Sequence, residues 1–226
     1  MIGRTAAFLI CCAAALMLIF AGAFAGAWLL TRMDGFFERA FAATGADEAT
    51  GIALNELMEV HRATVSYIKG GQEPPVITCM RRDGPIEFYK EDELRHLSDV
   101  RDVRAALGRL FAAAVLLLAA AFGASLMLPG DTGSRCLKLT SVLTALWTVF
   151  GSFMFEPLFT ALHRILFPGG NWIFYPDISL MVNLYSEGVF IRCGAFMGFT
   201  VLLVCLIPGI TGIVMGKRGK KKWKKT

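Results

Sequence analysis

The sequence lacks the short motifs that usually mark a metal site or a familiar catalytic centre. It has no C-x-x-C or H-E-x-x-H pair, so we expect no metal and no cofactor. It also lacks a G-x-S-x-G elbow, a glycine-rich phosphate loop and aspartates paired at nuclease or glycosidase spacing. Histidine is scarce, with three residues in a chain of 226. What is left favours a chemistry that uses histidine without an enzyme nucleophile.

A disulfide framework is not expected either, although the chain has six cysteines. Three of them lie in long apolar runs and a fourth lies in a short basic loop. Cys79 is the only one well inside a polar segment, and Cys193 is its sole conceivable partner. The chain therefore does not resemble a small secreted domain that depends on disulfides.

Charged residues are few, at 18% of the chain, while 55% of residues are hydrophobic and the mean hydropathy is +0.56. This composition is too apolar for an ordinary soluble domain. A membrane-spanning helix needs about 20 mostly apolar residues. Four stretches meet that length, within residues 1–30, 110–128, 137–160 and 193–215. The first is longer than the core of a secretory signal, about 7–15 residues, so we expect a retained span.

The basic residues that flank these stretches predict the orientation of the chain. The tail, residues 216–226, carries seven Lys and Arg residues and no acid, and Arg135 lies in the short loop 129–136. Both segments are therefore expected in the cytoplasm, with both termini, in a multi-pass protein of a bacterial cell membrane. The tail favours attraction to anionic membrane lipid, and we expect no nucleic-acid partner.

The outward-facing residues 31–109 are predicted to form a small α+β cap. Apolar spacing predicts helices over 34–49 and 52–68, and residues 90–108 predict a charged helix that continues into the second span. Two short apolar runs, 76–80 and 86–89, flank the turn signal Arg82-Asp83-Gly84 and predict a β-hairpin. The expected fold is thus an all-α membrane protein with four transmembrane helices and an extracytoplasmic α+β cap that contains a β-hairpin.

The second outward-facing segment, residues 161–192, is a short aromatic loop. Two prolines and two glycines within its residues 166–176 exclude one continuous helix. Trp172, Phe174 and Tyr175 fit the interfacial belt of a membrane protein, where aromatic rings rest at the level of the lipid headgroups. That explanation covers the aromatic residues about as well as a functional one.

Two histidines lie beside predicted spans and have acids at helical spacing. His96 is followed three residues later by Asp99, and His163 is preceded seven residues earlier by Glu156, with Thr160 between them. A helix would place Glu156 and His163 on one face. A carboxylate near a histidine fixes its tautomer and raises its basicity, as a general base requires.

The alternative for each histidine is an ordinary ion pair on a helix surface, which is the commoner role of a histidine beside an acid. Glu156 favours function, because an ionisable group inside a span is costly. His61, on a predicted cap helix, has no comparable support and is expected to be structural.

Two stretches resemble a known family. They are FYKEDELRHLSDV at residues 88–100 and EPLFTALH at 156–163, the latter continuing through Trp172, Pro176 and Leu184 to Glu187. With the four-span layout and the outward cap, they are similar to the lipoprotein intramolecular transacylases. The resemblance implies that the sn-2 acyl chain of a diacylglyceryl-modified lipoprotein moves to the α-amine of its N-terminal cysteine, which gives the lyso form.

The resemblance also implies roles for particular residues. His96 and His163 correspond to two catalytic histidines of that family. The residues expected to support them are Glu156, Asp99, Asn171, Trp172, Tyr175 and Arg164. Arg164, Asn171 or a backbone amide of residues 168–170 could stabilise the oxyanion, and the sequence does not choose among them.

The sequence departs from the family pattern at two positions. Tyr175 stands where the family often has an acid, and Ser186 where it often has proline. The rival interpretation is a non-enzymatic membrane protein, such as a transporter subunit or an assembly factor. Transporters tend to have paired repeats with interrupted helices and polar groups at mid-membrane, which this sequence lacks.

Overall fold

The computed structural model describes residues 4–128 and 131–223, and side chains over 8–128 and 131–217. Parts of the predicted cytoplasmic loop and most of the predicted basic tail therefore lie outside the described side chains. The chain divides into two compact units. The first unit takes in the residues up to Ala27, Arg109–Met154 and the residues from Ala195 on, and the second takes in Trp28–Gly108 and Phe155–Gly194.

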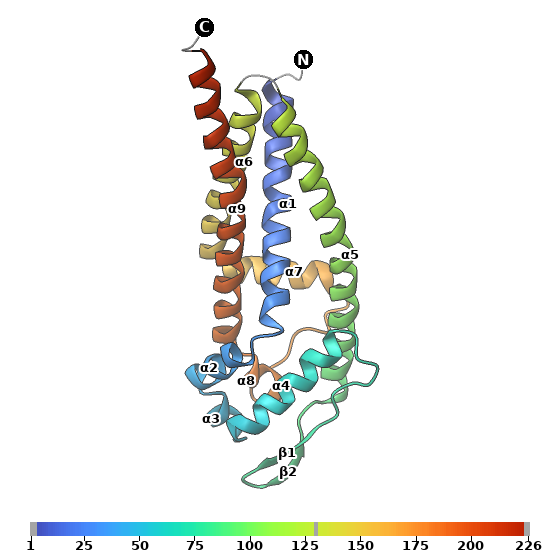
Figure 1. Cartoon of the computed structure of the whole chain (residues 1–226). Coiled ribbons are helices and arrows are strands. Elements are labelled where there is room, and N and C mark those ends of the chain that lie inside the picture. Colours follow the sequence, from blue (N-terminus) through green and yellow to red (C-terminus); the bar gives the residue numbers. More distant parts are fainter. Residues whose placement is uncertain (1–3, 129–130, 224–226) are drawn as a thin grey trace. The chain divides into compact units, whose positions relative to one another are not determined.

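Four helices within the described residues are long and apolar enough to cross a membrane. They are α1 (Arg4–Leu30), α5 (Glu91–Met127), α6 (Thr132–Phe153) and α9 (Glu187–Trp223) (Figure 1). This finding confirms the predicted fold class of a multi-pass helical membrane protein. The polar first half of α5, up to Gly108, and the start of α9 belong to the second unit.

The helices of the first unit approach one another closely at small residues. Thr200 of α9 donates a hydrogen bond to the carbonyl of Gly22 in α1 at 2.9 Å. A Cβ atom at Gly22 would lie 2.9 Å from the Cα of Val201, so a larger residue would push the two helices apart. Ser134 and Ser141 of α6 likewise donate to main-chain carbonyls of α9. Small residues and interhelical hydrogen bonds are the usual means of packing helices in lipid.

The helix predicted over 137–160 is broken in the structure. Helix α6 ends at Phe153, Met154 leaves the helical conformation with φ −105° and ψ 28°, and α7 (Phe155–Leu166) then begins. Pro157 explains the break, because proline is tolerated in a first helical turn but removes a hydrogen bond in a helix interior. Glu156 therefore lies in the first turn of a separate helix and not inside the third span.

The second unit contains the predicted α+β cap. Its helices are α2 (Asp34–Thr44), α3 (Ala46–Thr50), α4 (Leu54–Ile68) and α8 (Leu180–Leu184), which lie together with α7 and the hairpin. Gly45, in the left-handed conformation with φ 65°, ends the helix expected over 34–49.

The predicted hairpin is present. Strands β1 (Thr78–Arg81) and β2 (Gly84–Glu87) pair antiparallel, with Cys79 opposite Ile86. The turn falls at Arg82 and Asp83, as the sequence predicts. A β-bridge between Ile52 and Arg81 attaches the hairpin to the segment before α4.

His61 lies in the interior of this unit, in agreement with the structural role expected for it. Its side chain is buried, its ring centroid is 4.0 Å from that of Phe37, and Nδ1 is 3.0 Å from the hydroxyl of Tyr185. Burial lowers the pKa of His61 to about 4; the charge of Asp34 opposes this shift and that of Arg62 adds to it. His61 is thus a neutral core residue at physiological pH.

Candidate active site

His96 projects from the second turn of α5 into an aromatic surrounding. Its ring centroid is 5.0 Å from that of Phe167 and 5.6 Å from that of Phe174, both edge-on. The residue is 9% exposed, and its Nδ1 atom is buried without a hydrogen-bond partner among the described residues. A buried polar atom without a partner is costly, which points to a group that is completed by substrate.

His163 lies in α7 and has a defined tautomer. Its Nδ1 atom is 2.8 Å from the main-chain oxygen of Phe159, one turn earlier in the helix. A carbonyl oxygen can only accept, so Nδ1 carries a hydrogen, and in the neutral imidazole the lone pair is therefore on Nε2. Its ring contacts those of Phe159, at 4.0 Å, and Trp172, at 5.2 Å.

The two histidines lie on either side of one aromatic ring. Phe167, which directly follows α7, contacts His96 at 5.0 Å and His163 at 5.7 Å between ring centroids. The sequence predicted an aromatic loop over residues 161–192 but did not predict that Phe167 lies between the histidines. Its distance from His163 of four residues, one helical turn, was the available signal.

Burial sets the charge of His96. It lowers the pKa of His96 to about 4, and the nearby charge of His163 lowers it further, while Asp99 raises it. His96 is therefore neutral at physiological pH. A neutral imidazole has one N–H donor, and such a donor can polarise a carbonyl without carrying a positive charge itself.

Asn171 and Asp99 join the aromatic loop to α5. The side-chain amide of Asn171 donates a hydrogen bond to the carboxylate of Asp99. Both residues line a small hollow of about 310 Å³, together with Asp102 and Phe167. Two of the residues predicted to support catalysis are thus brought together, one turn of α5 from His96.

Three other predicted residues are placed differently. Glu156 is exposed and makes no hydrogen bond or ion pair with the described residues, so the orienting partner of His163 is the Phe159 carbonyl. Arg164 is also exposed and unpaired within this part of the chain. Tyr175 is 64% exposed, and its side chain has no polar or ring contact there. The spacing of these three residues in the sequence did not predict that their side chains would be exposed and without partners.

Glu93 is a buried carboxylate that sequence analysis missed. It is 1% exposed and accepts hydrogen bonds from the main-chain N–H of Lys90, at 2.8 Å, and the hydroxyl of Ser179, at 2.5 Å. The Ser179 oxygen in turn accepts from the N–H of Val182 and caps α8. The spacing of Lys90 and Glu93 is that of a capping box, which was the signal in the sequence.

Glu93 fixes the loop that carries the aromatic residues. It lies one turn before His96 in α5, and Ser179 lies at the end of the segment that contains Trp172 and Phe174. Its carboxylate accepts the main-chain N–H of Lys90 at the start of α5, and no basic side chain pairs with it among the described residues. The bond to Ser179 therefore holds the loop against the helix of His96.

The match to a protein family covers most of the chain. Residues 9–190 match the family described as lipoprotein intramolecular transacylase Lit. The chain belongs to this family. It is therefore a membrane-integral acyltransferase that acts within a lipoprotein, and the non-enzymatic alternative is not favoured.

Solved structures show the same fold for this transacylase. A structure of the lipoprotein intramolecular transacylase Lit from Bacillus cereus superposes with a TM-score of 0.68 at 14% identity, over 97% of each chain. A variant of that protein with a histidine replaced by arginine gives 0.67 at 12% identity, over 94% of this chain and 95% of the other. No curated protein sequence matches the chain.

Proposed function

We propose that this transacylase moves the sn-2 acyl chain of a diacylglyceryl-modified lipoprotein to the α-amine of its N-terminal cysteine. His96 and His163 are the catalytic residues of the proposed reaction. The observation that carries it is the contact of both imidazoles with Phe167, although they come from different helices. The product is an N-acylated lipoprotein with a free sn-2 hydroxyl.

His163 acts as the base in this proposal. The cysteine nitrogen attacks the ester carbonyl carbon and loses a proton to Nε2 of His163, whose Nδ1 hydrogen is held by Phe159. The tetrahedral intermediate then breaks its bond to the glyceryl oxygen, which receives the proton from His163. One ester becomes one amide and one hydroxyl, and no water is consumed. A histidine is well matched to an amine of pKa about 7.7–8.0.

His96 acts as a neutral donor. Its buried Nδ1 atom has no partner among the described residues, and burial keeps the ring uncharged. Its N–H is proposed to donate to the ester oxygen as negative charge develops there. Asn171 has one amide hydrogen in addition to the one given to Asp99, so it is a second candidate donor.

The aromatic rings around both histidines serve to exclude water. Phe167, Phe174 and Trp172 cover the imidazoles with apolar surface. Water would hydrolyse the ester, so its exclusion favours transfer over loss of the acyl chain. Donor and acceptor belong to one molecule, and well-oriented intramolecular reactions reach effective molarities of about 10⁵–10⁸ M.

The orientation in the membrane is part of the proposal. The basic residues near the chain ends and in the loop 129–136 support a proposed orientation with both termini in the cytoplasm and residues 31–109 and 161–192 outside. Membrane lipid surrounds the spans, and the diacylglyceryl anchor of the substrate reaches the enzyme from the same lipid layer. Short epitope tags at the N-terminus and between Arg82 and Asp83 test this. In spheroplasts, protease should remove only the second tag.

The reaction is tested with purified enzyme and a synthetic diacylated lipopeptide. The transfer leaves the mass unchanged, so tandem mass spectrometry must show acyl-cysteine fragments together with loss of the free amine. A mixture of two substrates, one with isotopes in both the acyl chain and the peptide, distinguishes intramolecular from intermolecular transfer. Products that combine a labelled chain with an unlabelled peptide would contradict the proposal.

A further inference from the structure

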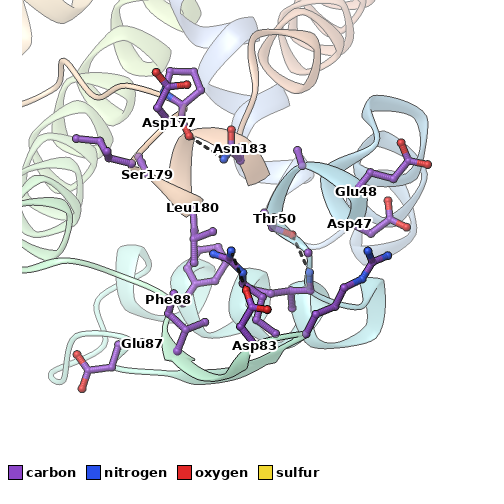
Figure 2. A pocket seen from close by; sticks show the side chains of 18 of the residues that line it. Asp47, Glu48, Thr50, Asp83, Glu87, Phe88, Asp177, Ser179, Leu180 and Asn183 are labelled. Atoms are coloured by element: carbon purple, nitrogen blue, oxygen red, sulfur yellow. Dashed lines mark hydrogen bonds and ion pairs between the residues drawn. The ribbon is translucent and has the colours of Figure 1, made fainter.

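A large hollow lies in the second unit beside the proposed active site. It has a volume of about 1010 Å³ and is walled by three segments of the chain, residues 47–53, 81–90 and 176–183. Figure 2 shows the hollow with Ser179, Leu180 and Asn183 from one lining segment, Thr50 from a second and Phe88 from the third. The proposed chemistry at the two histidines makes no use of this space.

The lining of the hollow indicates the kind of ligand that it suits. Acidic and basic side chains are mixed along the lining. Among the described lining residues, only Arg81 and Asp83 form an ion pair with each other, at 3.5 Å. Apolar groups such as Leu180 and Ile178 lie among them. The charged lining residues are Asp47, Glu48, Asp83, Glu87, Asp177, Arg81, Arg82 and Lys90.

This mixture excludes two classes of ligand and favours a third. An acyl chain would need an apolar lining, because burying charged groups against hydrocarbon is costly. A nucleic acid would need a predominantly basic one. A polypeptide carries apolar groups, both charges and main-chain polar groups, and it can pair with each kind of residue in the hollow.

The hollow is close to the two histidines along the chain. Trp172 contacts His163, and Pro176, four residues later, already lines the hollow. Four residues span at most about 14 Å. Ser179 also lines the hollow, and its hydroxyl donates a hydrogen bond to Glu93, which lies one turn of α5 before His96. The substrate's cysteine is its first residue, so its polypeptide leaves the site in one direction only.

We propose that this hollow binds the polypeptide of the substrate lipoprotein, from about the fourth residue after the modified cysteine. The inference rests on the proposed function and adds a second recognition element to it. The histidines then act on the lipid-bearing cysteine while the hollow holds the chain that follows. Because the lining has mixed charges and few deep apolar contacts, we expect the hollow to accept polypeptides of many sequences. The affinity for each polypeptide would then be the sum of many weak contacts.

The test compares two substrates and two enzymes. The short substrate is the diacylglyceryl cysteine amide, and the long substrate carries ten further residues with alternating lysine and glutamate. Arg82→Glu combined with Asp177→Lys reverses two unpaired charges of the hollow and leaves the net charge unchanged. The matched control, Arg39→Glu with Glu59→Lys, makes the same exchange at exposed positions outside the hollow.

The hollow variant should lower kcat/KM for the long substrate about three- to tenfold and leave the short one unchanged, since exposed charge pairs are each worth little. The control should affect neither substrate. Equal effects on both substrates, or none on the long one, would overturn the proposal. Failure of wild-type enzyme to acylate either amine would instead refute the proposed function.

A second measurement does not depend on turnover. A long substrate with a photoreactive residue at its fifth position should crosslink to residues 81–90 or 176–183 of the wild-type enzyme. An excess of the short substrate should reduce this crosslinking only in part, because the short substrate competes for the histidines but does not occupy the hollow. Crosslinks found only outside the three segments would overturn the proposal, whatever the rates.

Discussion

At the scale of single residues, the two histidines differ in what holds them. Nδ1 of His163 is committed to a main-chain carbonyl, whereas Nδ1 of His96 is buried without a partner. In the proposed mechanism, this asymmetry separates a base with a fixed lone pair from a neutral group that the substrate completes. The sequence predicted that both histidines matter but gave no reason to assign them different roles.

The assignment of His163 as base predicts the effect of His163→Asn. The asparagine amide can keep the hydrogen bond to Phe159 but has no atom at the position of Nε2. We expect a loss of about 10²–10⁴-fold in kcat, the usual contribution of a general base, with little change in thermal stability. Amide formation by mass spectrometry and thermal unfolding in detergent measure the two effects. Near-normal turnover would show that another group takes the proton.

Glu156 gives a second prediction at this scale. If Glu156 raised the basicity of His163, as the helical spacing in the sequence predicts, Glu156→Gln would slow transfer strongly and shift the acidic limb of the pH–rate profile to lower pH. The structure leaves the carboxylate exposed and gives its expected role to Phe159, so we now predict a change of less than about threefold. The pH–rate profile of the purified variant decides between the two. A large shift of the acidic limb would restore the original interpretation.

At the scale of elements, the bond between Glu93 and Ser179 ties α5 to the start of α8. Ser179→Ala removes that bond and the cap of α8 together. We expect a destabilisation of about 1–3 kcal/mol, because a helix cap is lost and a buried carboxylate loses a donor. Transfer should slow mainly through kcat, since the loop that packs on His96 loosens.

Ser66→Ala is the matched control for this variant. Ser66 is exposed on α4, and its side chain makes no hydrogen bond with the described residues. It should leave both the thermal midpoint and the rate unchanged. If Ser179→Ala behaves like Ser66→Ala, the contact between Glu93 and Ser179 does not position the loop.

The elements show what could be predicted from the sequence. Long apolar runs and the turn signal at Arg82 and Asp83 are local features, so the spans and the hairpin were predicted correctly. The break before Pro157 was also local but was hidden by the continuous hydrophobicity on both sides. The contacts of Phe167 with His96 and of Ser179 with Glu93 join segments far apart in the chain, and no periodicity within one segment reveals such contacts.

At the scale of the whole molecule, the buried neutral histidines predict a stability that depends on pH. The pKa values of His61 and His96 are each lowered to about 4, against about 6.5 in the unfolded chain. Between these values the unfolded state binds more protons, so stability is complete above about pH 6.5 and falls as the pH decreases toward 4. The thermal midpoint should decrease by roughly 5–10 °C across this range.

His61→Gln tests the contribution of one of these histidines. Glutamine can still pair with Tyr185 but does not titrate, so the midpoint of this variant should vary less steeply between pH 6.5 and 4. Asp34 and Arg62 lie near His61, and Asp99 and His163 near His96, and the variant leaves all four in place. An unchanged slope would show that other groups cause the loss of stability at low pH.

The carbonyl that holds His163 has a consequence for how this enzyme tolerates change over evolution. A main-chain oxygen is supplied by every amino acid, so a point mutation at position 159 alters the aromatic wall but cannot delete the hydrogen-bond acceptor. The tautomer of His163, the proposed base, is therefore lost only if α7 itself unwinds. Substitutions in the surrounding side chains therefore change the tautomer of His163 only if they destabilise α7. Selection on the proposed activity then acts on the stability of this helix as much as on any neighbouring side chain.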